Sequence, residues 1–142
     1  MNTISEISKT QNGLRTNAIV MIALLVIQYA LGMIANMFVQ FPDTTEPGQL
    51  WEFARTQFPT LAHILIGTLL VLVAVIFIIR AVRAHNGTWI ASSVFGLIGI
   101  LGAYWGGVTF VSTQVDAYSM VMALAFIIAF LAYGWGLYTS RS

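Results

Sequence analysis

Residues Pro59–Ile79 read PTLAHILIGTLLVLVAVIFII, and His63 is the one ionisable side chain in this run. A helix of about 20 apolar residues crosses a hydrocarbon core of roughly 30 Å. Lipid offers the ring nitrogens of a histidine no hydrogen-bond partner, so His63 must find one inside the protein or bind something there. His63 is therefore the first candidate for a functional site.

Three more apolar runs have spanning length, at residues 17–39, 88–111 and 117–139. The helix that contains the run with His63 is expected over residues 59–82. Of the 142 residues, 58% are hydrophobic and 8% are charged, which is more apolar surface than a soluble domain of this size can bury. We predict an all-α, four-helix transmembrane bundle that forms a single domain over residues 1–142. Its partner is the lipid bilayer, and no polybasic patch indicates nucleic-acid binding.

The charged residues outside these runs fall on two sides of the predicted bundle. One side carries basic residues with only Glu6 against them: Lys9, Arg15, Arg80, Arg83 and Arg141. The other side carries acidic residues with only Arg55 against them: Asp43, Glu46, Glu52 and Asp116. Because basic flanks face the cytoplasm, we predict a multi-pass protein of the inner cell membrane with both termini cytoplasmic. Residues 1–16 are polar and no cleavage site follows the first run, so that run is expected to stay as a helix.

The first outer loop is long, and residues 49–58 within it have the pattern of a short amphipathic helix. Leu50, Phe53, Ala54 and Phe58 fall along one side of it, and Trp51 would sit at headgroup level. Such a helix is either an interfacial anchor or a lid over a site at the outer end of the bundle. The two roles are compatible.

Polar and bulky residues gather in the outer half of the membrane, where unsatisfied polar groups are costly. They are Asn36, Gln40, His63, Tyr104, Trp105, Tyr118, Ser119, Met120 and Met122. The chain has no cysteine, so a metal there would be held by nitrogen, oxygen or thioether ligands. We expect any site to lie between the helices in this half.

The third run is rich in glycine at helical spacing, with Gly96, Gly99, Gly102 and Gly106 on one face. A face without side chains lets another helix approach closely, and it also suits a flat ligand. The pattern leaves both explanations open.

His63 itself has two explanations. It could be an axial ligand of haem iron, with Gly67 one turn further on leaving room for the edge of the macrocycle. It could equally be hydrogen-bonded to Asn36, Ser119 or a carbonyl group. His85 cannot share a site with His63, because 22 intervening steps of 1.5 Å place it about 33 Å away along a helix.

Three motifs carry a resemblance: Gln28-Tyr-Ala-Leu-Gly32 in the first run, Leu61-Ala-His63 at the start of the second, and Arg80 with Arg83 at its end. Together they resemble the four-helix unit of the haem A synthase family. That family fuses two such units into eight helices, and histidines of each unit bind haem in the outer half of the membrane. The resemblance covers most of residues 17–140 and implies a half-length relative that binds haem of the b type through His63.

The third and fourth runs look like a degenerate copy of the first two. Leu101-Gly102-Ala-Tyr-Trp-Gly106 echoes Leu31-Gly32-Met-Ile-Ala-Asn36, and Ser119 with Ala123 echoes His63 with Gly67. The resemblance therefore implies a cofactor site formed by Gly32, Asn36, His63, Gly67, Gly102, Gly106 and Ser119. Ser119 stands where the family has its second histidine and Thr60 where it has a glutamate, and the family's cysteine pair is absent. These departures leave open whether the chain is an enzyme.

The leading hypothesis is a small haem-binding membrane protein that serves as an electron carrier or as a haem-handling or accessory subunit of a respiratory system. The second axial position would be filled by Met120, by Met122 or by a partner chain, or left empty. The alternative is a cofactor-free structural subunit of a larger membrane oxidoreductase complex, docked through the glycine face. Either protein could be a homo-oligomer or part of a respiratory or oxygenase complex.

Cysteine accessibility tests the predicted topology, because the natural chain contains no cysteine. We expect a membrane-impermeant maleimide to label Glu46→Cys only from outside the cell. The control, His85→Cys, should be labelled only after the cytoplasmic side is opened. Labelling of Glu46→Cys from the cytoplasm alone would contradict the topology and the outer-half site.

Overall fold

The computed structural model describes residues 2–43 and 46–140, and the side chains of residues 2–5 and 7 are not described. Five helices make up the described structure: α1 Asn2–Phe38, α2 Pro47–Thr56, α3 Phe58–Arg83, α4 Gly87–Thr113 and α5 Asp116–Thr139. Four of them, α1, α3, α4 and α5, are long and apolar enough to cross a membrane. The all-helical bundle predicted from the sequence is confirmed, and it is that of a multi-pass membrane protein.

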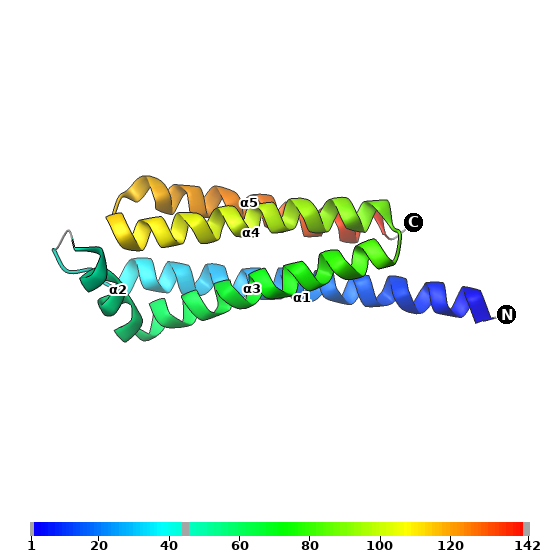
Figure 1. The fold of residues 1–142 in the computed structure, drawn as a ribbon, viewed down its shortest axis with the longest axis horizontal. Coiled ribbons are helices and arrows are strands. Elements are labelled where there is room, and N and C mark those ends of the chain that lie inside the picture. Colours follow the sequence, from blue (N-terminus) through cyan, green and yellow to red (C-terminus); the bar gives the residue numbers. More distant parts are fainter. Residues whose placement is uncertain (1, 44–45, 141–142) are drawn as a thin grey trace.

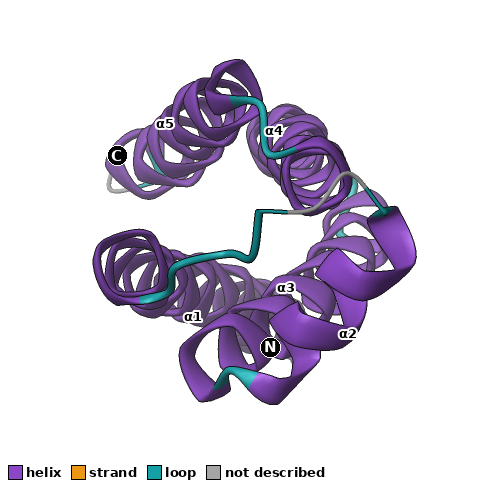
Figure 2. Cartoon of the chain, turned by 90° about the vertical axis from the view of Figure 1, so that its left-hand side faces the viewer, coloured by secondary structure: helices purple, strands orange, loops and turns teal. Residues whose placement is uncertain are grey.

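The four long helices form a ring in which each one packs against two neighbours (Figure 2). The order around the ring is α1, α3, α4 and α5, and the contact between α4 and α5 is the most extensive. Both ends of the chain lie at one end of the bundle, which we call the terminal end (Figure 1). The short helix α2 packs against α3 and α4 at the opposite end, which we call the α2 end (Figure 1).

Helix α1 begins at Asn2, well before the predicted start at residue 17. Residues 11–17 pack against the last turn of α3 and the first turn of α4, whereas residues 8–10 are exposed and the start of α1 extends beyond the bundle (Figure 1). Leu14 is buried, the Trp89 Nε1–H donates to Gln11 Oε1 over 3.2 Å, and the Arg80 guanidinium donates to Asn17 Oδ1 over 2.7 Å. Hydrophobic periodicity misses such a segment because its contacts are largely polar.

The predicted loop helix at residues 49–58 is present as α2, shifted by two residues. It starts at Pro47, whose fixed φ suits the first turn of a helix, and it ends at Thr56. Leu50 and Ala54 are buried as predicted. The placement of Phe58 on the same apolar face is wrong, because Phe58 opens α3 and is 79% exposed.

Three aromatic residues fill the bundle in its terminal half. The rings of Phe77 and Tyr133 stack at 5.7 Å between centroids, and Phe77 lies 5.8 Å from the ring of Trp89. All three are fully buried, and Ser92 ties α4 to α5 by donating to the Ala132 carbonyl over 2.8 Å. This half of the bundle is a packed core.

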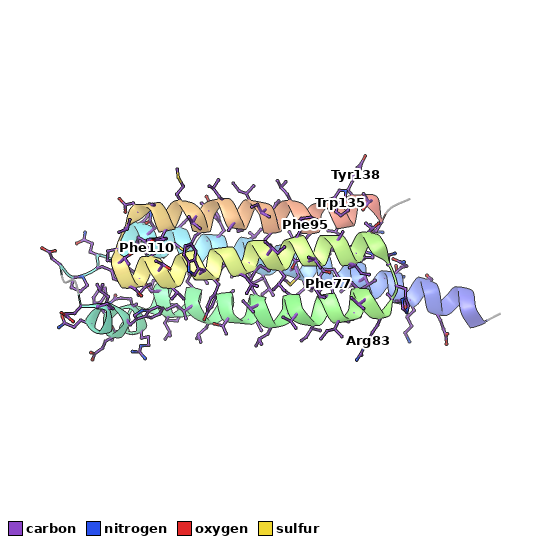
Figure 3. All side chains as sticks on the ribbon, turned by 45° about the horizontal axis from the view of Figure 1, so that its top comes forward. Phe77, Arg83, Phe95, Phe110, Trp135 and Tyr138 are labelled. Carbon is purple, nitrogen blue, oxygen red and sulfur yellow. The ribbon has the colours of Figure 1, made fainter. Side chains whose placement is uncertain are left out.

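The outward faces of the long helices carry large apolar side chains that suit contact with lipid. Phe95, Trp135 and Tyr138 are exposed on α4 and α5, and Tyr138 projects away from the bundle in Figure 3. Phe77 of α3 is buried. Exposure of such side chains is expected where the surroundings are hydrocarbon.

The glycine face of α4 is covered by α5. Gly96 lies against the ring of Tyr133, and a Cβ at Gly99 would lie 2.7 Å from both the Ala125 carbonyl oxygen and the Ala129 nitrogen. Packing between helices is therefore the role of this face. Its predicted use as a flat surface for a cofactor is wrong for the part that α5 covers.

The same substitution, glycine to alanine, at two positions separates the effect of helix packing on stability from the effect of helix propensity. Gly99→Ala should destabilise the bundle by ~1–3 kcal/mol, because the added Cβ meets backbone that cannot swing away. Gly134→Ala is the control, since no atom lies within 4 Å of its added Cβ, and it should stabilise α5 by up to ~1 kcal/mol. Unfolding of both variants in detergent measures the difference. Equal effects at the two positions would contradict the assigned α4–α5 contact.

Candidate functional site

A cavity of about 500 Å³ lies between the four long helices in the half of the bundle next to α2. This volume is within the range of roughly 300–1,000 Å³ that is usual for small-molecule sites. One residue from each long helix closes the cavity toward the terminal end: Leu25, Leu70, Ile100 and Ala129. All four are buried. The rings of Tyr29 and Phe126 stack at 5.2 Å and join α1 to α5 along one wall.

Residues of α2 and of the loop before it line the other end of the cavity. Trp51 of α2 lines the cavity, and its indole N–H donates to Ser112 Oγ over 3.0 Å. Phe41 of the loop meets the rings of Phe53 and Phe110, with centroids 5.5 and 6.3 Å apart. This hydrogen bond and these ring contacts attach α2 to the end of α4. The segment thus lies at the α2 end of the cavity, and its role as a lid stays a prediction.

His63 lines this cavity, and both of its ring nitrogens face one residue of α1, Gln28. Nδ1 lies 3.1 Å from the Gln28 backbone oxygen, and Nε2 lies 3.1 Å from the Gln28 side-chain nitrogen. A carbonyl oxygen only accepts, so Nδ1 carries the hydrogen and Nε2 accepts from the Gln28 amide. Of the predicted partners, a carbonyl is found. Asn36 and Ser119 are replaced by the Gln28 amide.

Two glycines make room for this pair. A Cβ at Gly32 would lie 2.9 Å from the Cε1 atom of His63, and a Cβ at Gly67 would lie 3.0 Å from the Gln28 side-chain nitrogen. The space beside Gly67, predicted to admit the edge of a macrocycle, holds the Gln28 amide instead. The two glycines, the histidine and the glutamine therefore form one unit across α1 and α3.

Some of the other predicted site residues line the cavity, and others do not. Asn36, Ser119 and Met122 line the cavity together with His63. Met120 is 67% exposed on the outward face of α5, because two helical steps turn it away from the face of Met122.

Gly102 and Gly106 also differ from their predicted place at the cofactor. A Cβ at Gly102 would contact the Ala125 Cβ at 3.3 Å, and one at Gly106 would contact the Tyr118 carbonyl oxygen at 3.1 Å. Both glycines serve the packing of α4 on α5. Spacing alone could not separate this role from ligand contact, because one face of a helix serves both.

Two buried polar atoms of the cavity lining have no hydrogen-bond partner among the described residues: Gln28 Oε1 and Thr60 Oγ1. A buried acceptor left unpaired costs about 1–3 kcal/mol, so such atoms are rare in a packed interior. Sequence analysis missed both atoms, and it also missed Met33, a second thioether that lines the cavity. No sequence signal marks them, since each depends on which helices are neighbours.

The donor set suits haem better than a bare metal ion. The described residues contain no group of three or more His, Cys, Asp or Glu side chains that could hold a metal. Haem iron needs only axial ligands from the protein, and one histidine supplies the first. His63 fits that role once the Gln28 amide turns away from Nε2. Met122 and Met33 are the thioethers within the lining.

No protein-family model, curated protein or solved structure matches this chain. The resemblance to the haem A synthase family therefore stays a prediction from sequence motifs.

The attachment of α2 can be tested through its hydrogen bond to α4. Trp51→Phe and Ser112→Ala should each raise hydrogen–deuterium exchange of the α2 amides about fivefold, since each removes the same bond. The double variant should be no faster than either single one. Thr109→Ala is the control, because Thr109 bonds only within α4, to the Trp105 carbonyl. Additive effects of the two substitutions would show that this bond does not hold the lid.

Proposed function

We propose that this protein binds haem in the cavity beside α2, with His63 as an axial ligand. It would act as an electron carrier or as a haem-handling or accessory subunit of a respiratory membrane system. The observation that carries the proposal is the state of the His63 ring, whose Nδ1–H is held by a backbone carbonyl while Nε2 keeps its lone pair. Histidines that bind metals are held in the same way at their second nitrogen.

The surroundings of His63 support this proposal. The lining is mostly apolar and aromatic, which keeps water away and raises the strength of the few polar contacts. Bound haem, of the b type, would supply one-electron transfer. The chain would supply Nε2 of His63, and Met122 or Met33 is the candidate for the second axial position. A partner chain or an open position is the other outcome.

The location and the assembly belong to the same proposal. We infer an inner cell membrane, with the terminal end cytoplasmic, from the basic residues gathered at that end, which include Lys9, Arg15, Arg80 and Arg83. The α2 end and its cavity would then lie in the outer half of the membrane. A homo-oligomer or a larger respiratory or oxygenase complex would provide the electron partner.

The alternative, a cofactor-free structural subunit, has lost the feature that supported it. Its docking surface was the glycine face of α4, which packs against α5 within this chain. The two unpaired polar atoms in the cavity also have no role in a subunit that acts through contact alone. The geometry therefore favours a ligand-binding protein.

A visible spectrum tests the haem proposal. Purified wild-type protein titrated with haem should gain a Soret band, and His63→Ala should lose that band while circular dichroism shows the helices intact. His85→Ala is the matched control, because His85 is exposed in the turn after α3 at the terminal end. A wild-type protein that stays colourless when haem is supplied would refute the proposal.

The same spectra identify the second ligand. Met122→Ala or Met33→Ala should convert low-spin iron to high-spin iron if that thioether is bound. Met120→Ala is the control on α5, since Met120 points outward. An unchanged spin state in both cavity variants assigns the position to a partner chain or leaves it open.

A further inference from the structure

We propose that Gln28 is a positioning residue that fixes the tautomer of His63 with its backbone and caps the metal-binding nitrogen Nε2 with its side chain. The inference deepens the proposed haem function and rests on it where haem is concerned. The cap itself concerns only this chain's own residues, so it can be tested without haem.

The two bonds that Gln28 makes to His63 differ in freedom. The backbone carbonyl of Gln28 belongs to α1, so its position is fixed by the helix. The side-chain amide turns about single bonds, so its bond to Nε2 can be released. Release of the amide alone would leave the Nδ1–H in place and free the Nε2 lone pair of a residue that lines the cavity.

The capped arrangement is only weakly favoured. The Gln28 amide gains one hydrogen bond to Nε2, but its own Oε1 is buried without a hydrogen-bond partner in the part of the chain that is described. A buried acceptor in this state offsets much of what the bond contributes. The amide is therefore poised to leave when a ligand binds Nε2 more strongly than an amide N–H does.

The neighbouring glycines keep both positions of the pair open. Gly67 leaves space for the capping amide, since a Cβ there would lie 3.0 Å from the amide nitrogen. Gly32 leaves space for the imidazole ring in the same way. A larger residue at either place would push the amide or the ring aside. In this group of four residues, the Gln28 amide covers Nε2 of His63, and a competing ligand can displace it.

Diethyl pyrocarbonate measures the cap directly. A neutral imidazole nitrogen attacks one carbonyl carbon of the reagent, the ring gains an ethoxycarbonyl group and loses its proton, and ethanol and carbon dioxide leave. The chain contains two histidines, so mass spectrometry follows His63 and His85 in one sample. His85 is exposed and serves as the internal standard.

Removal of the amide should uncover His63. We expect Gln28→Leu and Gln28→Ala to speed acylation of His63 about fivefold relative to His85, the factor for one hydrogen bond of typical net strength. Alanine is included because leucine could itself shield the ring. Gln11→Leu is the matched control, since it removes an interhelical bond of α1 to Trp89 about 25 Å away, at 1.5 Å per residue. Unchanged rates at His63 in both Gln28 variants would overturn the cap.

A second measurement separates positioning from general loosening of the bundle. The ¹⁵N shifts of the His63 ring should keep the Nδ1–H tautomer in the Gln28 variants, because the backbone carbonyl remains, while the Nε2 signal moves. A switch to the Nε2–H tautomer would contradict the division of roles between backbone and side chain.

Haem titration then distinguishes the cap from the proposed function. If both are right, Gln28→Leu should bind haem about fivefold more tightly than wild type. Faster acylation without haem binding in any variant supports the cap and refutes the haem proposal. Haem binding by wild type with unchanged acylation in the variants supports the haem proposal and refutes the cap.

Discussion

The close approach of α4 to α5 is the constraint from which the rest of the bundle follows. Gly99 brings the two backbones into contact, so these helices form a rigid pair along their length. α1 and α3 complete the ring, and in the terminal half the rings of Phe77, Trp89 and Tyr133 fill the space between the helices. In the half beside α2 the side chains that line the interior leave a cavity of about 500 Å³. The half of the bundle at the terminal end is thus closely packed, and the half at the α2 end contains the cavity.

Polar groups inside the bundle depend on partners from the protein, because lipid satisfies none. At the terminal end, interhelical bonds join Trp89 to Gln11 and Arg80 to Asn17. Beside the cavity, Gln28 bonds to His63 through its backbone oxygen and its side-chain nitrogen, but its Oε1 atom has no hydrogen-bond partner among the described residues. Thr60 Oγ1 also lacks a partner among these residues. The Tyr133 hydroxyl, in the packed terminal half, is also buried without a partner among the described residues. The unpaired atoms beside the cavity therefore support a ligand site only together with the cavity that they line.

Features that depend on a single helix could be predicted from the sequence, whereas features that depend on contact between two helices could not. Apolar runs predicted the four long helices, and the amphipathic pattern of residues 49–58 predicted α2. The start of α1 was not predicted because residues 2–16 are mostly polar and lack the apolar run of a membrane span. The partner of His63 was not predicted, although Gln28 stood in a quoted motif, because 35 residues separate them and the sequence does not state which helices are neighbours.

Two explanations for His63 fit the same hydrogen bonds: a structural histidine with both ring nitrogens paired, and a haem ligand. A histidine bonded at both nitrogens is satisfied, and satisfaction alone would suffice for a residue of a packed core. His63 lies instead in a cavity wall, and its Nε2 bond comes from a side chain that leaves its own oxygen unpaired. A ligand that displaced the amide from Nε2 would free the amide to find partners for both of its polar atoms. The cost of the unpaired oxygen is explained if the Gln28 amide holds the place of a ligand that binds the same nitrogen.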